Sequence, residues 1–234
     1  MRLTDMRCVR SAVVAAGLAI TMTLGLAAAS AQRAAPAGSG ETFKDTSMLK
    51  PPPGVRVAII EFQDLTCPAC ARAFPVVHAA VARYNIPLYQ RDFLLGGEHA
   101  MLGDAEAAVW ARYLQDKVSP KVADDYRGAV FAAQTSIGNK DDMLNFTRKF
   151  FQQHGLQMPF VPDPSGELGR EVAADKALGV KLGVQFTPAV IVCSQHEWVH
   201  VTNMDLLYQT IDEVEAKAGP AAPVKTVAAK KAAQ

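Results

Sequence analysis

Two cysteines three residues apart are the side chains of this sequence best suited to chemistry. Cys67 and Cys70 stand in "EFQDLTCPACARAFP", directly after the apolar run "VRVAIIEF". Such a pair can be a redox couple, half of a metal site or a structural staple. A staple is disfavoured, because a disulfide that closes a loop of two residues restricts the unfolded chain very little.

A zinc site would need two further ligands, since structural zinc is usually held by four side chains. The candidates are Cys193, His196 and His200 in "CSQHEWVH". They fall on an expected β-hairpin, where the two histidines would point along one face and Cys193 need not converge with them. A metal site therefore remains only an alternative.

The redox interpretation has a physical basis at the start of a helix. Cys67 would face unpaired backbone N–H groups and the positive end of the helix dipole, which favour the thiolate. Cys70, one turn further in, would be shielded and could resolve a mixed disulfide. Pro68 suits a first helical turn, where its missing N–H is not needed. We therefore predict that Cys67 attacks and Cys70 resolves.

The pattern around the pair predicts a βαβ unit followed by a helical block. A buried strand at 54–62, a helix that starts at Pro68 and contains Pro75, and a strand at 86–95 form the unit. Helices are then expected at 98–115, 120–134, 141–154 and 167–182. Strands at 189–193 and 197–201 complete the sheet as a hairpin, and a helix capped by Asn203 or Thr202 ends the fold. The order predicts an α/β fold in which helices are inserted between two halves of a sheet.

The two ends of the chain differ from this core. Residues 1–31 combine a basic start, an apolar stretch and Ala29-Ser30-Ala31, and they predict a secretory signal cleaved after Ala31. An uncleaved membrane anchor is the alternative. Residues 32–53 are expected to be a linker and 219–234 a disordered Ala/Lys/Pro tail, because neither can bury enough apolar surface.

Charge and composition exclude several classes. The chain has 24 Lys+Arg and 23 Asp+Glu. Cleavage would remove three arginines and one aspartate and leave 21 against 22. A net charge near zero argues against a nucleic-acid binder. The rest holds no second long apolar segment, so we expect no stable membrane insertion after cleavage.

Other chemistry finds little support in the sequence. Cys67, Cys70 and Cys193 remain after cleavage, too few for a disulfide scaffold in an exported protein. The histidines at 78, 99 and 154 adjoin no G-x-S-x-G pattern, so a hydrolase is not indicated.

Three segments together resemble a known family. "EFQDLTCPACARAFP", "RDFLLGGEHAMLGDAEAAVWA" and "GVQFTPAVIV" are similar to the DsbA-like branch of the thioredoxin superfamily. The resemblance spans about 54–218 and implies a thioredoxin-like fold with a helical insertion at about 97–182. It also implies a periplasmic protein that exchanges disulfides with cysteine-containing protein substrates. Such a protein uses no metal or organic cofactor, and a membrane redox partner recycles its disulfide.

The resemblance assigns roles to five residues. Cys67 and Cys70 would be the redox pair. Pro188 would be the cis-proline beside the site, preceded by Thr187. Glu61 would be the buried acid that moves a proton to or from the resolving thiol. From the residues alone, the alternatives are that Glu61 is a surface charge at the end of a strand and that Pro188 is an ordinary strand-entry proline.

Two positions depart from the family pattern. Ala69 stands where the best-known strong oxidants carry histidine, so we expect Cys67 to be less acidic and the disulfide less oxidising. Cys193 lies in an expected buried strand, where it acts either as a small apolar residue or as a further redox thiol.

The function predicted from these features is disulfide exchange in the direction of substrate oxidation. A reductase or isomerase with the same site is the first alternative. A thioredoxin-fold binding or chaperone module whose disulfide is incidental is the second.

Overall fold

A computed structural model describes residues 48–221 and 223. The predicted signal peptide at 1–31, residues 32–47 of the predicted linker and most of the tail lie outside the described residues. Cleavage after Ala31 therefore remains a prediction. Within the expected linker, Leu49 is 1% exposed and packs against the core. The core thus includes a residue that precedes the expected boundary at Gly54.

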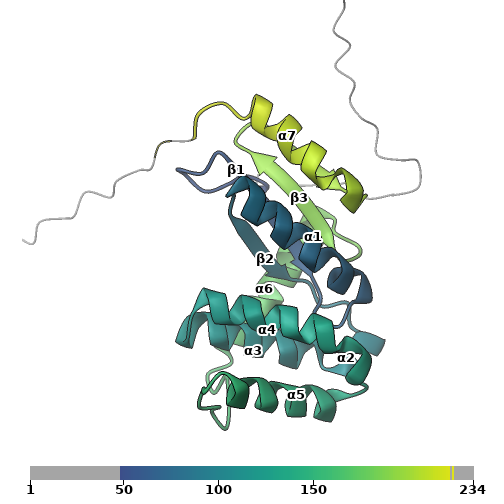
Figure 1. The fold of residues 1–234 in the computed structure, drawn as a ribbon. Coiled ribbons are helices and arrows are strands. Elements are labelled where there is room, and N and C mark those ends of the chain that lie inside the picture. The colour runs from purple at the N-terminus through teal and green to yellow at the C-terminus, as the bar shows by residue number, and fades with distance from the viewer. Residues whose placement is uncertain (1–47, 222, 224–234) are drawn as a thin grey trace, which may run out of the picture. The chain divides into compact units, whose positions relative to one another are not determined.

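A four-stranded mixed sheet lies at the centre of the described residues (Figure 1). Its strands are β1 (Val57–Gln63), β2 (Leu88–Asp92), β3 (Ala189–Ser194) and β4 (Trp198–Val201). They stand in the order β2-β1-β3-β4, with β1 parallel to β2 and antiparallel to β3, and with β3 antiparallel to β4. The βαβ unit and the hairpin are both confirmed.

The helices follow the predicted order with small differences. They are α1 (Pro68–Tyr84), α2 (Glu98–Leu102), α3 (Asp104–Lys117), α4 (Pro120–Ala133), α5 (Lys140–Gln153), α6 (Glu167–Leu182) and α7 (Leu207–Lys217). The helix expected at 98–115 is divided at Gly103, which has a φ of 89° and caps α2. Asn203 caps a short 3-10 turn (Met204–Leu206) that precedes α7, instead of α7 itself.

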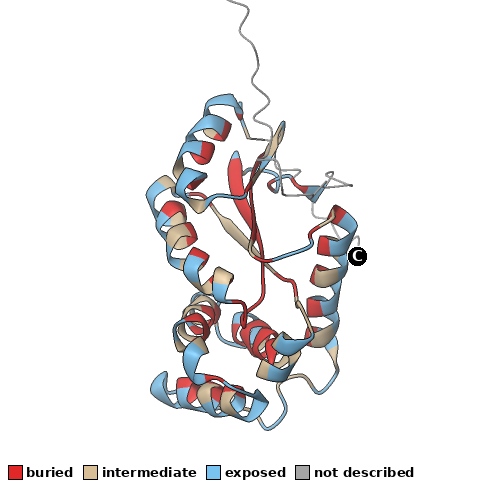
Figure 2. Ribbon diagram, turned by 90° about the vertical axis from the view of Figure 1, so that its right-hand side faces the viewer, coloured by how far each residue is buried: buried red, intermediate tan, exposed pale blue. Residues whose placement is uncertain are grey.

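The two faces of the sheet are covered by different helices. Val57 and Ile59 belong to a cluster with residues of α1 and α7, whereas Ala58, Ile60 and Phe62 belong to another that Leu182 of α6 joins. Figure 2 shows the central strands as largely buried and the helices as buried on one side only. Because side chains alternate along a strand, Glu61 faces the same side as Ile59, toward α1.

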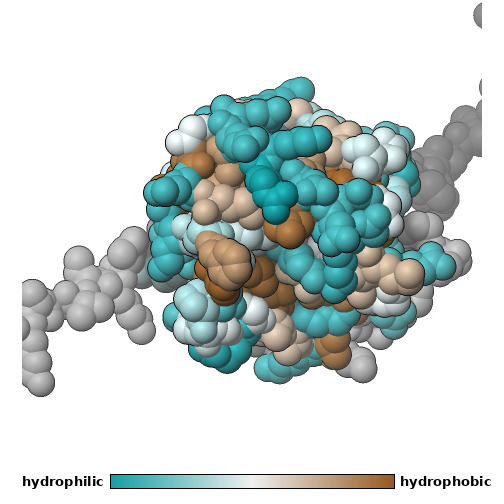
Figure 3. Space-filling view, turned by 90° about the horizontal axis from the view of Figure 1, so that it is seen from below, coloured by the Kyte–Doolittle hydropathy of each residue, from teal (hydrophilic) through white to brown (hydrophobic). Residues whose placement is uncertain are grey.

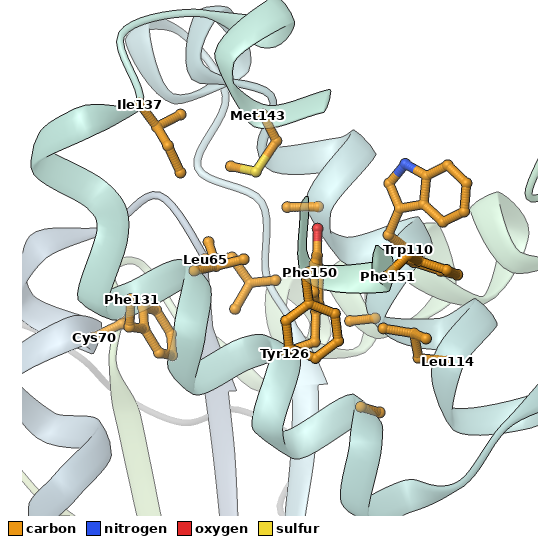
Figure 4. Close-up of a cluster of buried hydrophobic side chains, with 14 of the residues drawn as sticks. Leu65, Cys70, Trp110, Leu114, Tyr126, Phe131, Ile137, Met143, Phe150 and Phe151 are labelled. Carbon is orange, nitrogen blue, oxygen red and sulfur yellow. The ribbon is translucent and has the colours of Figure 1, made fainter. Parts of the chain in front are cut away.

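A second core lies among α3, α4 and α5. Its members include aromatic side chains such as Trp110, Tyr126 and Phe150, and Cys70 of α1 belongs to the same cluster (Figure 4). The Tyr126 hydroxyl lies 2.7 Å from Thr147 Oγ1, so this buried polar group is satisfied. Cys70, the predicted resolving cysteine, therefore packs against the helical insertion.

Buried ion pairs join this insertion to the sheet. Asp92, at the end of β2, accepts hydrogen bonds from Arg112 Nε of α3 and Arg127 Nη1 of α4, each at 2.7 Å. Arg112 also pairs with Asp175 of α6. Removing one partner of such a pair leaves an uncompensated buried charge, so the network fixes how the insertion sits on the sheet.

The surface of the described residues is mostly polar with apolar interruptions. Figure 3 shows apolar side chains scattered among hydrophilic ones on the side of the molecule where α5 lies. Phe160 and Met101 are among the exposed large apolar residues. Over the described residues, no helix combines the length and the apolar character that crossing a membrane requires.

Candidate active site

The loop between β1 and α1 is held by the buried carboxylate of Asp64. One of its oxygens accepts hydrogen bonds from the backbone N–H of Thr66 at 2.8 Å and from Thr66 Oγ1 at 2.7 Å. The other accepts from the N–H of Leu95 at 2.8 Å. These three bonds fix the loop against the segment after β2, and the loop delivers Cys67 to the start of α1.

Cys67 is the N-cap residue of α1. Its backbone is extended, with φ −80° and ψ 120°, and Pro68 opens the helix behind it. The Cys67 carbonyl accepts the first helical hydrogen bond, from Ala71 at 3.2 Å. Its thiol therefore stands where the first N–H groups of a helix have no helical partners. The helix start predicted from Pro68 is confirmed.

The environment of Cys67 favours its thiolate. A hydrogen bond from the Cys70 thiol makes the largest contribution and lowers the pKa of Cys67, while burial acts in the opposite direction. The side chain of Thr187 and the first N–H groups of α1 lower it further, and the resulting pKa is about 5. Cys67 is therefore ionised at neutral pH.

Cys70 has the opposite character. It is fully buried, and burial raises its pKa far above the usual range, with a smaller upward contribution from the hydrogen bond to Cys67. Cys67 is 5% exposed and is thus the more accessible of the two. All three described cysteines are free thiols in this structure. A thiolate that is less deeply buried, beside a fully shielded thiol, is the asymmetry that an attacking and a resolving cysteine require.

Glu61 is buried as the resemblance implied. It is 0% exposed, and neither carboxyl oxygen has a hydrogen-bond partner among the described residues. Burial raises its pKa to about 7, against the lowering charges of His78 and Arg127. The alternative of a surface charge at the end of a strand is therefore wrong.

The segment before β3 reaches the cysteine pair from the other end of the sequence. The Thr187–Pro188 peptide bond is cis, as the resemblance implied. The Cys67 thiol lies 3.5 Å from the Thr187 carbonyl oxygen. The structure thus brings Cys67, Cys70, Thr187 and Pro188 to one place, with Glu61 buried on the face of the sheet that α1 covers.

Two residues near the site carry no signal in the sequence. Gln134, directly after α4, donates from Nε2 to the carbonyl oxygens of Leu65 and Cys67, at 2.8 and 3.1 Å. His99 of α2 places Nδ1 2.8 Å from Thr66 Oγ1. Both contacts join segments more than 30 residues apart, so no local pattern could have revealed them.

A histidine–carboxylate pair near Glu61 was also unforeseen. His78 Nε2 lies 2.8 and 3.0 Å from the two carboxylate oxygens of Asp124. Burial lowers the pKa of His78, but the hydrogen bond and charge of Asp124 outweigh it and raise the pKa overall. Spacing in the sequence gives no hint, because His78 lies on α1 and Asp124 on α4.

Cys193 lies in the middle of the sheet, apart from this site. It is 0% exposed, and burial raises its pKa to about 12. Its packing among Ala58, Ile191 and other apolar residues favours the interpretation as a small apolar side chain. Among the residues that the structure describes, no group of three or more histidine, cysteine, aspartate and glutamate side chains is placed to hold a metal ion.

The family described as Thioredoxin matches residues 53–213. This range covers both cysteines, the helical insertion and the cis-proline. The chain belongs to the thioredoxin family. No match to this thioredoxin-family chain was found among curated proteins.

Solved structures share the fold of this thioredoxin-family protein. Proteus mirabilis ScsC in a transitional conformation is 18% identical, with a TM-score of 0.54, over 70% of this chain and 69% of that one. A periplasmic thioredoxin-like protein from Salmonella enterica serovar Typhimurium is also 18% identical, with a TM-score of 0.56, over 69% and 86%. Wolbachia pipientis α-DsbA1 is 16% identical, with a TM-score of 0.56, over 75% and 98%. The fold is therefore DsbA-like, as the sequence indicated.

Proposed function

We propose that this protein is a thiol–disulfide oxidoreductase that acts on cysteine-containing protein substrates. The observation that carries the proposal is the asymmetry of the pair. The pKa of Cys67 is lowered to about 5 at the start of α1, whereas burial raises the pKa of Cys70. A buried staple or a structural thiol would need no such difference.

The proposed chemistry is a pair of exchange reactions. A substrate thiolate attacks Cys67 Sγ of the oxidised protein, so that the Cys67–Cys70 bond breaks and a substrate–Cys67 bond forms. Cys70 leaves as a thiolate and takes a proton from Glu61. A second substrate thiolate then attacks the mixed disulfide, forms the substrate disulfide and releases Cys67 as a thiolate. The two electrons lost by the substrate are held by the reduced pair, and no cofactor takes part.

Substrate oxidation is the proposed direction. A low pKa of Cys67 stabilises the reduced form of the protein. It also makes the Cys67 thiolate a better leaving group from the mixed disulfide, as in oxidising members of the superfamily. A membrane redox partner would then restore the disulfide. Reduction of substrate disulfides is the second candidate. Ala69 favours it, because alanine offers the Cys67 thiolate no side-chain hydrogen bond or charge.

The proposed location is the periplasm or another exported compartment. The signal predicted at 1–31 supports it, and so does the description of the Salmonella enterica relative as periplasmic. An oxidising compartment is also where a protein disulfide donor finds its substrates.

The experiment is substrate oxidation by the purified protein without residues 1–31. The oxidised protein should form disulfides in a reduced, unfolded substrate with two cysteines, and Cys67→Ser should abolish this activity. Cys193→Ala is the matched control and should retain it. Retained activity in Cys67→Ser would refute the proposed function. A reduction potential less negative than about −180 mV would support the oxidising direction, and one near about −270 mV the reducing direction.

A further inference from the structure

Glu61 carries a buried carboxyl group that has no evident route to solvent. The residue is 0% exposed, and its two oxygens have no hydrogen-bond partner among the described residues. In the proposed reaction Glu61 gives a proton to Cys70 when the disulfide is reduced, and its carboxylate then needs a proton from solvent to return to its starting state. Another group must therefore pass this proton between Glu61 and water.

A cavity opens on the face of the sheet toward which Glu61 points. Glu61 of β1 pairs in register with Gln90 of the parallel strand β2, so both side chains point to the same side. Gln90 lines a cavity of about 500 Å³, together with His78, Val81, Arg91, Lys121 and Asp124. This volume holds several water molecules, since one occupies about 30 Å³ in the liquid.

The pair formed by His78 and Asp124 lines this cavity, and His78 is close enough to Glu61 for its charge to act on that carboxyl group. His78 Nδ1 lies 2.9 Å from the Phe74 carbonyl oxygen, and Nε2 faces Asp124. Gln90 Nε2 donates to the same carboxylate at 3.2 Å. Both ring nitrogens of His78 thus face acceptors, an arrangement that suits the imidazolium form.

The charges of Glu61 and His78 depend on each other. The negative charge of Glu61 contributes to the raised pKa of His78, and the positive charge of His78 lowers the pKa of Glu61. The other charged groups near them are Arg127 of α4, which acts on Glu61, and three cations that line the cavity: Arg91 of β2, Arg112 of α3 and Lys121 of α4. Asp124 is the carboxylate of α4 that faces the imidazole.

We propose that the His78–Asp124 pair, which lines the cavity, relays the proton between Glu61 and solvent during disulfide exchange. The relay rests on the proposed function. When Cys70 leaves as a thiolate it takes the proton of Glu61, and the Glu61 carboxylate then receives one from the His78 imidazolium. His78 regains its proton from solvent. In the full reaction the two substrate thiols release two protons, of which one ends on Cys70 and one in solution.

The fold offers a matched control for His78. His154, at the end of α5, stacks on Phe150 with ring centroids 3.9 Å apart, and its Nδ1 lies 2.9 Å from the Phe150 carbonyl oxygen. His78 makes the same contacts with Phe74, at 3.8 and 2.9 Å. The two histidines differ in their surroundings, because only His78 has the carboxylate partner and the cavity. His154→Ala therefore removes an equivalent ring without touching the relay.

The experiment measures the reduction of the oxidised protein by glutathione, a single-turnover step in which Cys70 must be protonated. We expect His78→Ala to slow this step at least roughly tenfold, with imidazole added to the buffer restoring part of the rate. His154→Ala should react as the wild type does. In a Glu61→Gln background, His78→Ala should add little further loss, since both changes interrupt one path.

Specific outcomes would overturn the relay. A His78→Ala protein that reacts at the wild-type rate would do so, as would a slowed protein on which imidazole has no effect. If His78→Ala does not fold, Asp124→Asn takes its place, and it must slow the same step while leaving the unfolding temperature near that of His154→Ala. A wild-type protein that does not exchange with glutathione at all would overturn the proposed function as well, which separates the two failures.

Discussion

The thiol of Cys67 lies 3.5 Å from the carbonyl oxygen of Thr187, although 120 residues separate them in the sequence. The start of α1 and the segment before β3 therefore meet at one sulfur atom. Backbone groups from both segments face a thiol that is 5% exposed. Because contacts from two distant segments reach the Cys67 thiol, its reactivity depends on the whole fold and not only on the four residues of the motif.

The first prediction concerns the acidity of Cys67. Its rate of alkylation by iodoacetamide should follow a titration with a midpoint of about pH 5. Cys70→Ala should move this midpoint upward toward the ordinary thiol range of about 8.5, because it removes the largest lowering contribution. Cys193→Ala should leave it unchanged. A midpoint near 8.5 in the unaltered protein would contradict this account of the site.

The second prediction concerns Ala69. In Ala69→His, a donor beside the thiolate should lower the pKa of Cys67 and make the disulfide more oxidising. Each unit of pKa corresponds to about 1.4 kcal/mol, or roughly 30 mV for a two-electron couple. Equilibration with glutathione measures the potential. Ala79→His, an exposed position on the same helix, is the control, and an equal shift in both variants would show that the effect is not local.

The third prediction concerns Glu61 and the pH dependence of stability. Its pKa is raised in the folded protein to about 7 from the ordinary 4.5, so the folded state holds this proton more tightly. The stabilisation is fully present below about pH 4.5 and is lost as the pH rises through about 7. The total change is on the order of 3 kcal/mol for this fully buried group.

Urea unfolding of the reduced protein between pH 4 and 8 tests this. In Glu61→Gln, the free energy of unfolding should decrease less as the pH rises. Glu171→Gln, a change at an exposed position of α6, should leave the decrease as it is in the wild type. A wild-type free energy that does not fall more steeply than that of Glu61→Gln over this range would rule out the raised pKa.

The fourth prediction concerns the packing of α6 on the sheet. A Cβ atom at Gly179 would overlap the Phe93 ring and would make a tight contact with Phe62 at 3.2 Å, so these side chains would have to shift. Gly179→Ala should therefore destabilise the fold by about 1–3 kcal/mol through overpacking. Gly169→Ala on the same helix meets only an ordinary contact at 3.5 Å, and it should stabilise by roughly 0.5–1 kcal/mol. Thermal unfolding of the two variants tests the contrast, and equal effects would contradict it.

The elements were predictable because their signals are local. The apolar run before Cys67 and the periodicity after Pro68 gave β1 and α1, and Pro188 marked the entry to β3. The division of the helix at Gly103 escaped prediction, since a glycine inside a helical pattern is compatible with continuation. Its positive φ is visible only in the folded chain.

The centre of the site was predictable and its surroundings were not. Spacing and the resemblance placed Cys67, Cys70 and Pro188 in one site. Gln134 and the His78–Asp124 pair act through contacts between distant segments, and these depend on how the helical insertion packs on α1. That packing depends on buried ion pairs such as Asp92 with Arg127. From the sequence alone, charged residues of this kind are expected at the surface.

The most direct test of the central claim is to trap the mixed disulfide. Cys70→Ser protein whose remaining thiols have been converted to mixed disulfides with Ellman's reagent should be mixed with a reduced, unfolded substrate that has one cysteine, and analysed by peptide mass spectrometry. Without the resolving thiol, the account predicts a stable substrate adduct on Cys67 and none on buried Cys193. An adduct on Cys193 alone, or no adduct on Cys67 while the protein stays folded, would contradict the claim that Cys67 is the residue that exchanges disulfides.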